Sequence, residues 1–323
     1  MAELSQKVLK GDRLAVSKAI TAIENRDQSS GDILKGIFPQ TGRAFIVGVT
    51  GPPGTGKSSL VDQLVRLYRA KDKRIAVLAV DPSSHVSGGA ILGDRVRMMS
   101  HTLDSGVYIR SMASRGDEGG LSRAARNAVR ILDAAGNDVV IVETVGTGQT
   151  EVEIVRVADV VVVVLMPELG DEIQAAKAGL MEIGDIFAVN KCDLPGSDKV
   201  MYNLETVLTT KSGWHQVAVK VSAKTGEGLD NLLSALEEFR AHMQKSSDTS
   251  RKIQNISEEL LQNVSLALAE EIESSFRNDP ELHEIATKVV ERQIDPESAV
   301  RILVQRFRAY SSRKDSESTK RGG

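Results

Sequence analysis

The chain has 323 residues, a net charge of -3 and a pI near 6.0, so it gives no reason to expect nonspecific binding to nucleic acid. Aromatic residues make up only 3%, which argues against a stacking surface for single-stranded nucleic acid. The single cysteine, Cys192, excludes an internal disulfide, and the longest apolar run, Val160 to Met166, is far shorter than the roughly 20 residues of a membrane span. With no secretory or transit signal at the N-terminus, these features predict a cytoplasmic protein that contacts neither membrane nor nucleic acid.

Residues 1–42 carry apolar side chains at helical spacing, with Asp12 placed to cap the second predicted helix. From Arg43 the pattern changes to short apolar runs separated by helical or glycine-rich segments. Several of these runs are apolar at every position, as expected of parallel strands buried on both faces. Strands that alternate with helices predict an α/β fold with a doubly wound, mostly parallel sheet. The runs are AFIVGV, RIAVLAV, VYIR, NDVVIVE, DVVVVVLM, DIFAVN and QVAVKVS.

The C-terminal part of the chain is predicted to be helical. A polar linker at Met243–Lys252 precedes an amphipathic helix from Ile253 to Phe276. A break at NDP follows, and Asp295 with Pro296 then predicts the start of a further helix. Periodicity alone leaves open whether these helices form a lid on the sheet domain or a dimer arm. The expected domains are an N-terminal helical segment over 1–42, the sheet domain over 43–243, a helical region over 244–310 and a disordered tail over 311–323.

The segment GPPGTGKS, residues 51–58, lies between a predicted strand and a predicted helix and matches the phosphate-binding pattern G-x-x-x-x-G-K-[ST]. Its glycines let backbone N–H groups turn toward phosphate oxygens. Lys57 adds a cation for the β and γ oxygens, and Ser58 offers a hydroxyl to Mg²⁺. The predicted phosphate-binding residues are Gly51, Pro52, Pro53, Gly54, Thr55, Gly56, Lys57, Ser58 and Ser59.

A second motif, N-K-x-D in AVNKCD, predicts recognition of guanine. Asp193 would accept hydrogen bonds from the guanine ring N–H and amine, Lys191 would stack on the ring, and Asn190 would bind the base edge or brace the loop. Cys192 occupies the variable position, and no second cysteine suggests a redox role.

The next predicted strand is followed by SAKTGEG, in which Ser222, Ala223 and Lys224 are expected to support the base, with the Ala223 N–H facing the guanine carbonyl. Three motifs in this order, each at the carboxyl end of a strand, favour GTP and GDP over adenine nucleotides.

Acidic residues lie near the phosphate loop at the ends of the predicted strands. Asp81 ends one strand, Glu143 ends another, and Asp94 lies in SGGAILGDRVRM. Mg²⁺ prefers carboxylate and hydroxyl oxygens beside phosphates, and several carboxylates in one site repel each other unless a cation is present. Ser58, Asp81, Asp94 and Glu143 are therefore the predicted Mg²⁺ ligands, directly or through water.

These motifs, together with IRSMASRG, VETVGTGQTE and GDEIQAAKAG, resemble the GTPase chaperones of cobalamin-dependent acyl-CoA mutases. This is the methylmalonyl-CoA mutase-associated MeaB type within the G3E class of P-loop GTPases, formerly labelled arginine/ornithine transport kinase. The resemblance spans residues 10–240. It implies a homodimer joined through C-terminal helices, which binds the mutase, gates delivery of adenosylcobalamin from an adenosyltransferase and helps to rescue inactivated cofactor.

The resemblance also implies three switch segments: 83–94, 143–151 and GDEIQAAKAG, the last with Asp171, Gln174 and Lys177 as signalling residues. Gly146 would sense the γ-phosphate through its N–H. The segment MPELGDE places Glu168 and Leu169 where the family usually has small residues, a departure that bears on the choice of partner. The implied catalytic residues are Lys57, Glu143, Gln149 and Lys177.

Hydrolysis needs an in-line water and neutralisation of charge on the transferred phosphoryl group. Thr147 follows Gly146 where Ras-type GTPases carry the glutamine that orients this water, and Gln149 lies further along. We therefore expect slow intrinsic turnover that the partner mutase accelerates. The alternatives are a GTPase for nickel insertion, which usually carries a Cys/His cluster that this sequence lacks, a kinase, which N-K-x-D disfavours, and a binding scaffold with a vestigial GTPase.

Overall fold

The computed structural model describes residues 2–81, 101, 103–113, 120–144, 154–167, 179–245, 249–277 and 279–320. The chain divides into two compact units, Met1–Asp248 and Thr249–Gly323. Within these described ranges, no helix combines the length and the apolar character needed to cross a membrane.

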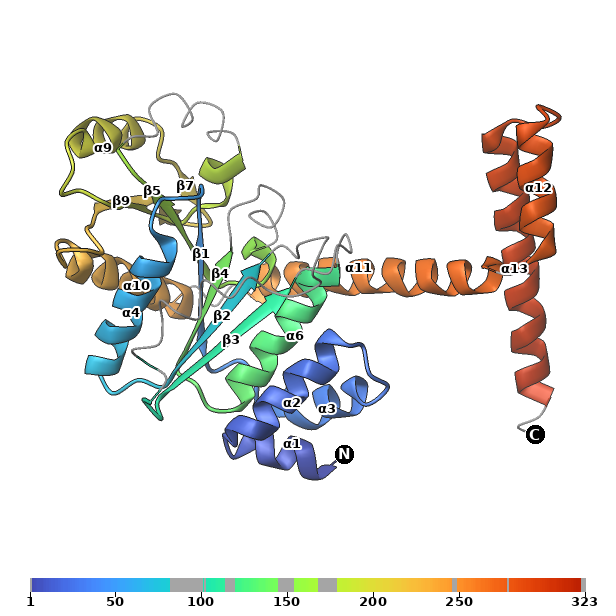
Figure 1. Ribbon diagram of the computed structural model, residues 1–323, viewed down its shortest axis with the longest axis horizontal. Helices are drawn as coiled ribbons and strands as arrows, with labels where there is room; N and C mark the ends of the chain where they lie inside the picture. The colour runs from blue at the N-terminus through green and yellow to red at the C-terminus, as the bar shows by residue number, and fades with distance from the viewer. Residues whose placement is uncertain are drawn as a thin grey trace. The chain divides into compact units, whose positions relative to one another are not determined.

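The first unit is built on a seven-stranded sheet with the order β3-β2-β4-β1-β5-β6-β9 (Figure 1). All neighbouring strands in it are parallel. The predicted α/β class is confirmed, and each apolar run named from the sequence forms one strand. The strands are β1 (Phe45–Thr50), β2 (Ile75–Asp81), β3 (Val107–Ala113), β4 (Val139–Thr144), β5 (Val160–Leu165), β6 (Ile186–Val189) and β9 (Val217–Lys220).

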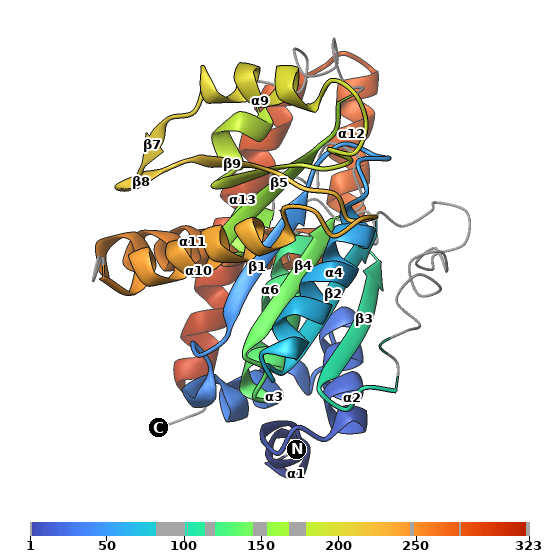
Figure 2. The ribbon, with the colours of Figure 1, turned by 90° about the vertical axis from the view of Figure 1, so that its left-hand side faces the viewer.

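Helices cover both faces of the sheet (Figure 1 and Figure 2). On one face α4 and α10 bury the side chains of Val47 and Val49. On the other face α1, α2, α3 and α6 pack against Ile46, and α9 covers the region of Phe187. The helices of this unit are α1 (Ala2–Leu9), α2 (Arg13–Glu24), α3 (Ser30–Ile37), α4 (Lys57–Ala70), α6 (Gly120–Ala134), α9 (Ser197–Glu205) and α10 (Leu229–Lys245), with the 3-10 turns η1 (Phe38–Gln40) and η3 (Ile154–Arg156).

The sequence pattern explains this layering. Successive residues of a strand point to opposite faces, so a run that is apolar throughout fills both layers. Val47 and Val49 are fully buried, and Ile46 is nearly so. Each such side chain contributes about 1.5–3 kcal/mol when it leaves water. The helix starts follow local chemistry as well: Asp12 caps α2 by accepting a hydrogen bond of 2.7 Å from the Ala15 N–H, as predicted.

A small antiparallel hairpin precedes β9 and was not expected from the sequence. It joins β7 (Thr210–Lys211) to β8 (Trp214–His215). Each of its strands is only two residues long and partly exposed, too short to show the apolar alternation by which a strand is recognised.

The second unit consists of α11 (Thr249–Phe276), α12 (Pro280–Val290) and α13 (Pro296–Lys320). Asp295 precedes α13, and its carboxylate accepts from the Ser298 N–H at 2.9 Å, which confirms the predicted helix start. The helical backbone continues to Lys320, whereas a disordered tail was expected from residue 311. No proline or glycine occurs between Pro296 and Gly322, so nothing in the local sequence ends the helix earlier.

Candidate functional site

The carboxyl ends of the central strands carry the loop between β1 and α4, and two of its glycines are required by the geometry. Gly51 has φ 138°, and a Cβ there would lie 2.3 Å from the carbonyl oxygen of Val164. Gly56 has φ 88° and forms the N-cap of α4, where a Cβ would lie 2.5 Å from Asn190 Nδ2. Both positions combine left-handed backbone with close packing, so only glycine fits.

Lys57, at the start of α4, lies inside this loop. Its Nζ donates to the carbonyl oxygens of Gly51 at 2.7 Å and Pro52 at 2.9 Å, and the residue is only 7% exposed. Thr55 Oγ1 also donates to the Pro52 carbonyl oxygen, at 2.9 Å. The helix N-terminus and the ammonium group together create a positive centre that suits a phosphate.

Ser58 and Glu143 meet beside the loop. Ser58 Oγ donates to Glu143 Oε1 at 2.6 Å, and Glu143 is 1% exposed. The sheet register places Glu143 opposite Val49 on β1 and opposite Ala79 on β2. A buried carboxylate is costly without a compensating charge or hydrogen bonds. The hydroxyl and carboxylate oxygens are of the kind that Mg²⁺ prefers, so this pair fits that ion.

Asp81 ends β2, the strand beside β4, and its backbone is in register with Ala113 of β3. It thus lies at the same sheet edge as Glu143, two positions beyond the Glu143 partner Ala79. The side chain of Asp81 lies outside the described part of the structure. Four further predicted site residues lie entirely outside the described part of the structure: Asp94, Gly146, Gln149 and Lys177.

On the far side of the loop, Asn190 follows β6 and connects two predicted nucleotide-binding segments. Its Nδ2 donates to the Thr55 carbonyl oxygen at 2.8 Å, and its Oδ1 accepts from the Ala223 N–H at 3.0 Å. The side chain is 2% exposed. Asn190 was predicted either to bind the base edge or to brace the loop. Its contacts are those of a brace, because they join the phosphate loop to the loop after β9. They also mean that the Ala223 N–H, expected to face guanine, here serves the Asn190 amide.

Asp193 is exposed, but a hydrogen bond from a buried residue holds its carboxylate in place. Ser222 Oγ donates to Asp193 Oδ1 at 2.7 Å, and Ser222 is fully buried. The Thr225 N–H donates in turn to Ser222 Oγ at 3.2 Å. An exposed acceptor held by a buried hydroxyl is suited to the donors of a base edge.

Lys191 adopts a left-handed backbone with φ 58°, which is unusual for a residue with a side chain. Its Nζ lies 3.2 Å from Met166 Sδ, at the end of β5. Such a conformation costs about 1–2 kcal/mol, and strained positions cluster at functional sites. At the neighbouring Cys192, burial, together with the Glu227 carboxylate, raises the pKa of the thiol. It therefore lacks the thiolate character of a reactive cysteine.

Sequence reasoning missed one residue of this network. Gln63 Nε2, from α4, donates to the Ala223 carbonyl oxygen at 3.0 Å. It ties the helix after the phosphate loop to the loop after β9. Gln63 belongs to no motif, and its spacing is that of an ordinary helical residue, so nothing in the sequence marks it.

A phosphate loop after β1, a buried acid at the end of β4 and an N-K-x-D loop after β6 together define a P-loop GTPase fold. The particular family follows from comparison with known proteins. The family model described as "Methylmalonyl Co-A mutase-associated GTPase MeaB" matches residues 16–278, and the chain belongs to this family. The resemblance seen in the sequence is confirmed.

Individual relatives agree. A protein of Pyrococcus horikoshii named as a GTPase is 44% identical over 312 residues, which cover 94% of this chain and 98% of that protein. The GTPase ArgK of Escherichia coli is 35% identical over 257 residues, which cover 76% and 78% of the two chains. The crystal structure of LAO/AO transport system kinase matches with a TM-score of 0.71 and 26% identity, over 95% of this chain and 97% of that one.

Proposed function

We propose that the protein is a GTP-hydrolysing chaperone of an adenosylcobalamin-dependent acyl-CoA mutase of the methylmalonyl-CoA mutase type. It would gate cofactor loading and protect or reactivate the mutase. The family description names this mutase as the associated protein, which supports the choice of partner. The observation that carries the nucleotide part is Asn190, because one buried amide joins the phosphate loop at Thr55 to the base loop at Ala223.

In this proposal the protein's own side chains hold the nucleotide in three ways. Lys57 exchanges its bonds to the loop carbonyls for bonds to phosphate oxygens. Asp193, oriented by Ser222, accepts from guanine. Ser58 and Glu143 hold Mg²⁺ together with Asp81 and Asp94, directly or through water. When bound, Mg²⁺ neutralises charge on the phosphates.

Turnover in the free protein is proposed to be slow, since the sequence has Thr147 where a water-orienting glutamine would help. Gly146, Gln149 and Lys177 would then act in the state that the mutase stabilises, with a cobalamin adenosyltransferase as a second protein partner. The proposed location is the cytoplasm.

We further propose that the helical region from residue 244 to 310 forms a homodimer. Support comes from α11, which carries an exposed apolar stripe at helical spacing: Ile253, Ile256, Leu260, Val264, Leu268 and Ile272. An amphipathic helix with such a face needs an apolar partner.

The test is GTP turnover of the full chain with and without methylmalonyl-CoA mutase from the same organism, at saturating mutase. We expect a rise of at least tenfold, together with co-elution of the two proteins in a nucleotide-dependent manner. The Lys57→Ala variant provides the control for contaminating activity. Unchanged turnover and separate elution would contradict the assignment of this partner, while GTP binding alone would keep the nucleotide assignment.

A further inference from the structure

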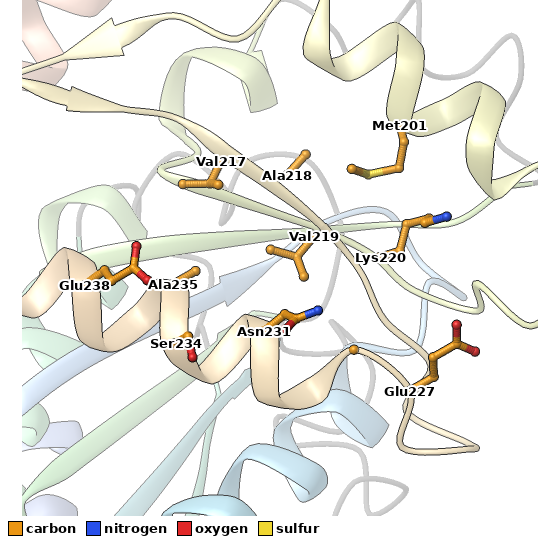
Figure 3. A pocket seen from close by; sticks show the side chains of 11 residues that line it. Met201, Val217, Ala218, Val219, Lys220, Glu227, Asn231, Ser234, Ala235 and Glu238 are labelled. Carbon is orange, nitrogen blue, oxygen red and sulfur yellow. The ribbon is translucent and has the colours of Figure 1, made fainter.

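The outer side of β9 forms a groove, one end of which reaches Glu227 and Gly228 in the loop after β9. Strand β9 is the last strand of the sheet, and it lies between α9 and α10 (Figure 3). The hollow has a volume of about 500 Å³. We call it the edge groove and define it by Met201, Ala218, Lys220, Asn231, Ser234 and Glu238.

The backbone at the centre of this groove is oriented outward. The Val217 N–H donates to the Asp185 carbonyl oxygen, and the Val221 N–H donates to that of Val189, so these positions face β6. Because N–H and C=O groups alternate sides along a parallel strand, the groups of Ala218 face away from β6. No strand within the described residues pairs with this side.

One end of the groove is closed by the chain itself. A Cβ on Gly228 would lie 1.9 Å from the Lys220 carbonyl oxygen, so the Gly228 backbone covers that acceptor. Ala218 therefore provides the outward donor and acceptor that another strand can reach. Edge strands with free groups of this kind are the sites where extended peptides add to a sheet.

The two walls of the groove differ in chemistry. Met201 supplies an apolar, half-buried wall on α9. On α10 the exposed polar side chains of Asn231, Ser234 and Glu238 stand at spacings of three and four residues, so they line one face of the helix (Figure 3). A peptide strand in the groove would point alternate side chains at these two walls.

The charges of the groove are unbalanced. Lys220 is already ion-paired with Asp198 at 2.7 Å. Glu227 and Glu238 also line the hollow, and the described residues include no ion-pair partner for Glu238. The net negative potential favours a cationic side chain on the α10 wall.

We propose that the edge groove binds an extended, basic peptide segment of a partner protein by strand addition to β9. Main-chain hydrogen bonds to Ala218 hold the segment. Apolar side chains contact Met201, and the alternate Lys or Arg side chains contact Glu238. The preferred segment thus alternates apolar and basic residues. The residues that hold the segment, Ala218, Met201 and Glu238, belong to none of the predicted nucleotide-binding segments, so the proposal does not depend on the mutase assignment.

The test uses the full chain and a fluorescently labelled peptide of sequence Val-Lys-Val-Lys-Val. Two matched peptides provide the controls: Val-Glu-Val-Glu-Val and the basic peptide with N-methylated backbone amides. We expect the basic peptide to bind at least tenfold more tightly than either control in fluorescence anisotropy. Equal binding of all three would overturn the proposal, because neither charge nor main-chain pairing would then matter.

Variants of the protein locate the binding. Glu238→Lys should weaken binding of the basic peptide about fivefold, since an attraction becomes a repulsion. It should strengthen binding of the acidic peptide for the opposite reason. Glu237→Lys makes the same change one position along α10, outside the groove, and should alter neither. Ala218→Pro removes the outward N–H donor, a change that edge strands tolerate, and should weaken binding of the basic peptide, because a peptide carbonyl oxygen loses its partner.

Two further results would contradict the proposal. If free lysine competed as well as the peptide at equal concentration, the groove would hold a cation only. If Glu238→Lys changed the sedimentation coefficient of the protein without peptide, a second copy of the chain would occupy the groove instead.

Discussion

Both ends of the Asn190 amide are hydrogen-bonded within the protein, to Thr55 and to Ala223. Substitution by Ala leaves a buried acceptor and a buried donor without a partner. Each costs about 1–3 kcal/mol, so Asn190→Ala should lower the free energy of unfolding by about 2–4 kcal/mol and weaken GDP binding. Urea unfolding and nucleotide titration measure the two effects. Asn190→Asp keeps the acceptor for Ala223 but sets a buried carboxylate oxygen against the Thr55 carbonyl oxygen, so it should destabilise as well. An unchanged free energy of unfolding in Asn190→Ala would contradict the two-sided brace.

Asp193 is the residue predicted to distinguish guanine from other bases. Asp193→Asn exchanges a carboxylate for an amide, which pairs poorly with the donors of guanine but can donate to the extra oxygen of xanthine. We expect GDP affinity to fall by at least tenfold and xanthosine diphosphate affinity to rise. The Ser222 contact at 2.7 Å keeps the position oriented in both forms. Loss of GDP binding with no gain for the xanthine nucleotide would count against the role of Asp193 as the guanine reader.

Among the elements, the loop between β1 and α4 offers a matched pair of glycines. Gly54 has φ 78° and Gly56 has φ 88°, but a Cβ meets nothing within 4 Å at Gly54 and lies 2.5 Å from Asn190 Nδ2 at Gly56. Gly54→Ala should cost only the backbone strain, about 1–2 kcal/mol. Gly56→Ala should cost more and also weaken GDP binding, since Asn190 must move. Thermal unfolding of both variants measures the difference; equal effects would show that the contact with Asn190 is unimportant.

The connection between α4 and the start of β3 is electrostatic. Arg69 Nε lies 2.8 Å from Asp104 Oδ2, and this hydrogen bond, with a further one from the Gly106 N–H, lowers the pKa of Asp104 below its ordinary value of 3.8. Because the folded-state pKa is depressed, the unfolded chain binds the proton more readily. The contribution of Asp104 is therefore complete above the ordinary pKa and is lost as the pH falls through the lower folded-state value.

We accordingly expect wild type to be more stable than Asp104→Asn at neutral pH, with the difference shrinking as the pH falls below 3.8. Chemical unfolding at a series of pH values measures this. Asp72→Asn is the control: its carboxylate lies 3.8 Å from Arg69 and is fully exposed, so it should change little at any pH. A difference for Asp104→Asn that does not vary with pH would contradict the ion pair.

Across the whole molecule, the sequence predicts well those strands and helix starts that a local residue pattern determines. The strands follow from unbroken β-branched runs such as Val160–Leu165, and the helix starts at Asp12 and Asp295 follow from capping chemistry. The loops that meet at the strand ends are predictable because parallel strands share a carboxyl edge.

Long-range hydrogen bonds leave no such pattern. Gln216 is 2% exposed and uses its amide to join the Thr209 N–H, at 2.8 Å, to the carbonyl oxygens of Met181 and Gly184. A glutamine before a strand carries no local signal of this role. The same is true of Gln63, and of the hairpin β7–β8, whose strands have only two residues each. These contacts depend on segments distant in sequence, and only the fold brings them together.

The exposed apolar stripe on α11 predicts that the chain assembles into a homodimer through this helix. Leu260 and Val264 are 59% and 54% exposed, and burying such side chains in a second copy contributes roughly 1 kcal/mol or more each. The double substitution Leu260→Glu and Val264→Glu places carboxylates on that face and should convert a dimer to a monomer in sedimentation equilibrium. Ala269→Glu adds a carboxylate on the other side of the same helix and should leave the dimer intact. A dimer that survives the double substitution would place the interface elsewhere, and a monomeric wild type would remove the dimer from the proposed function.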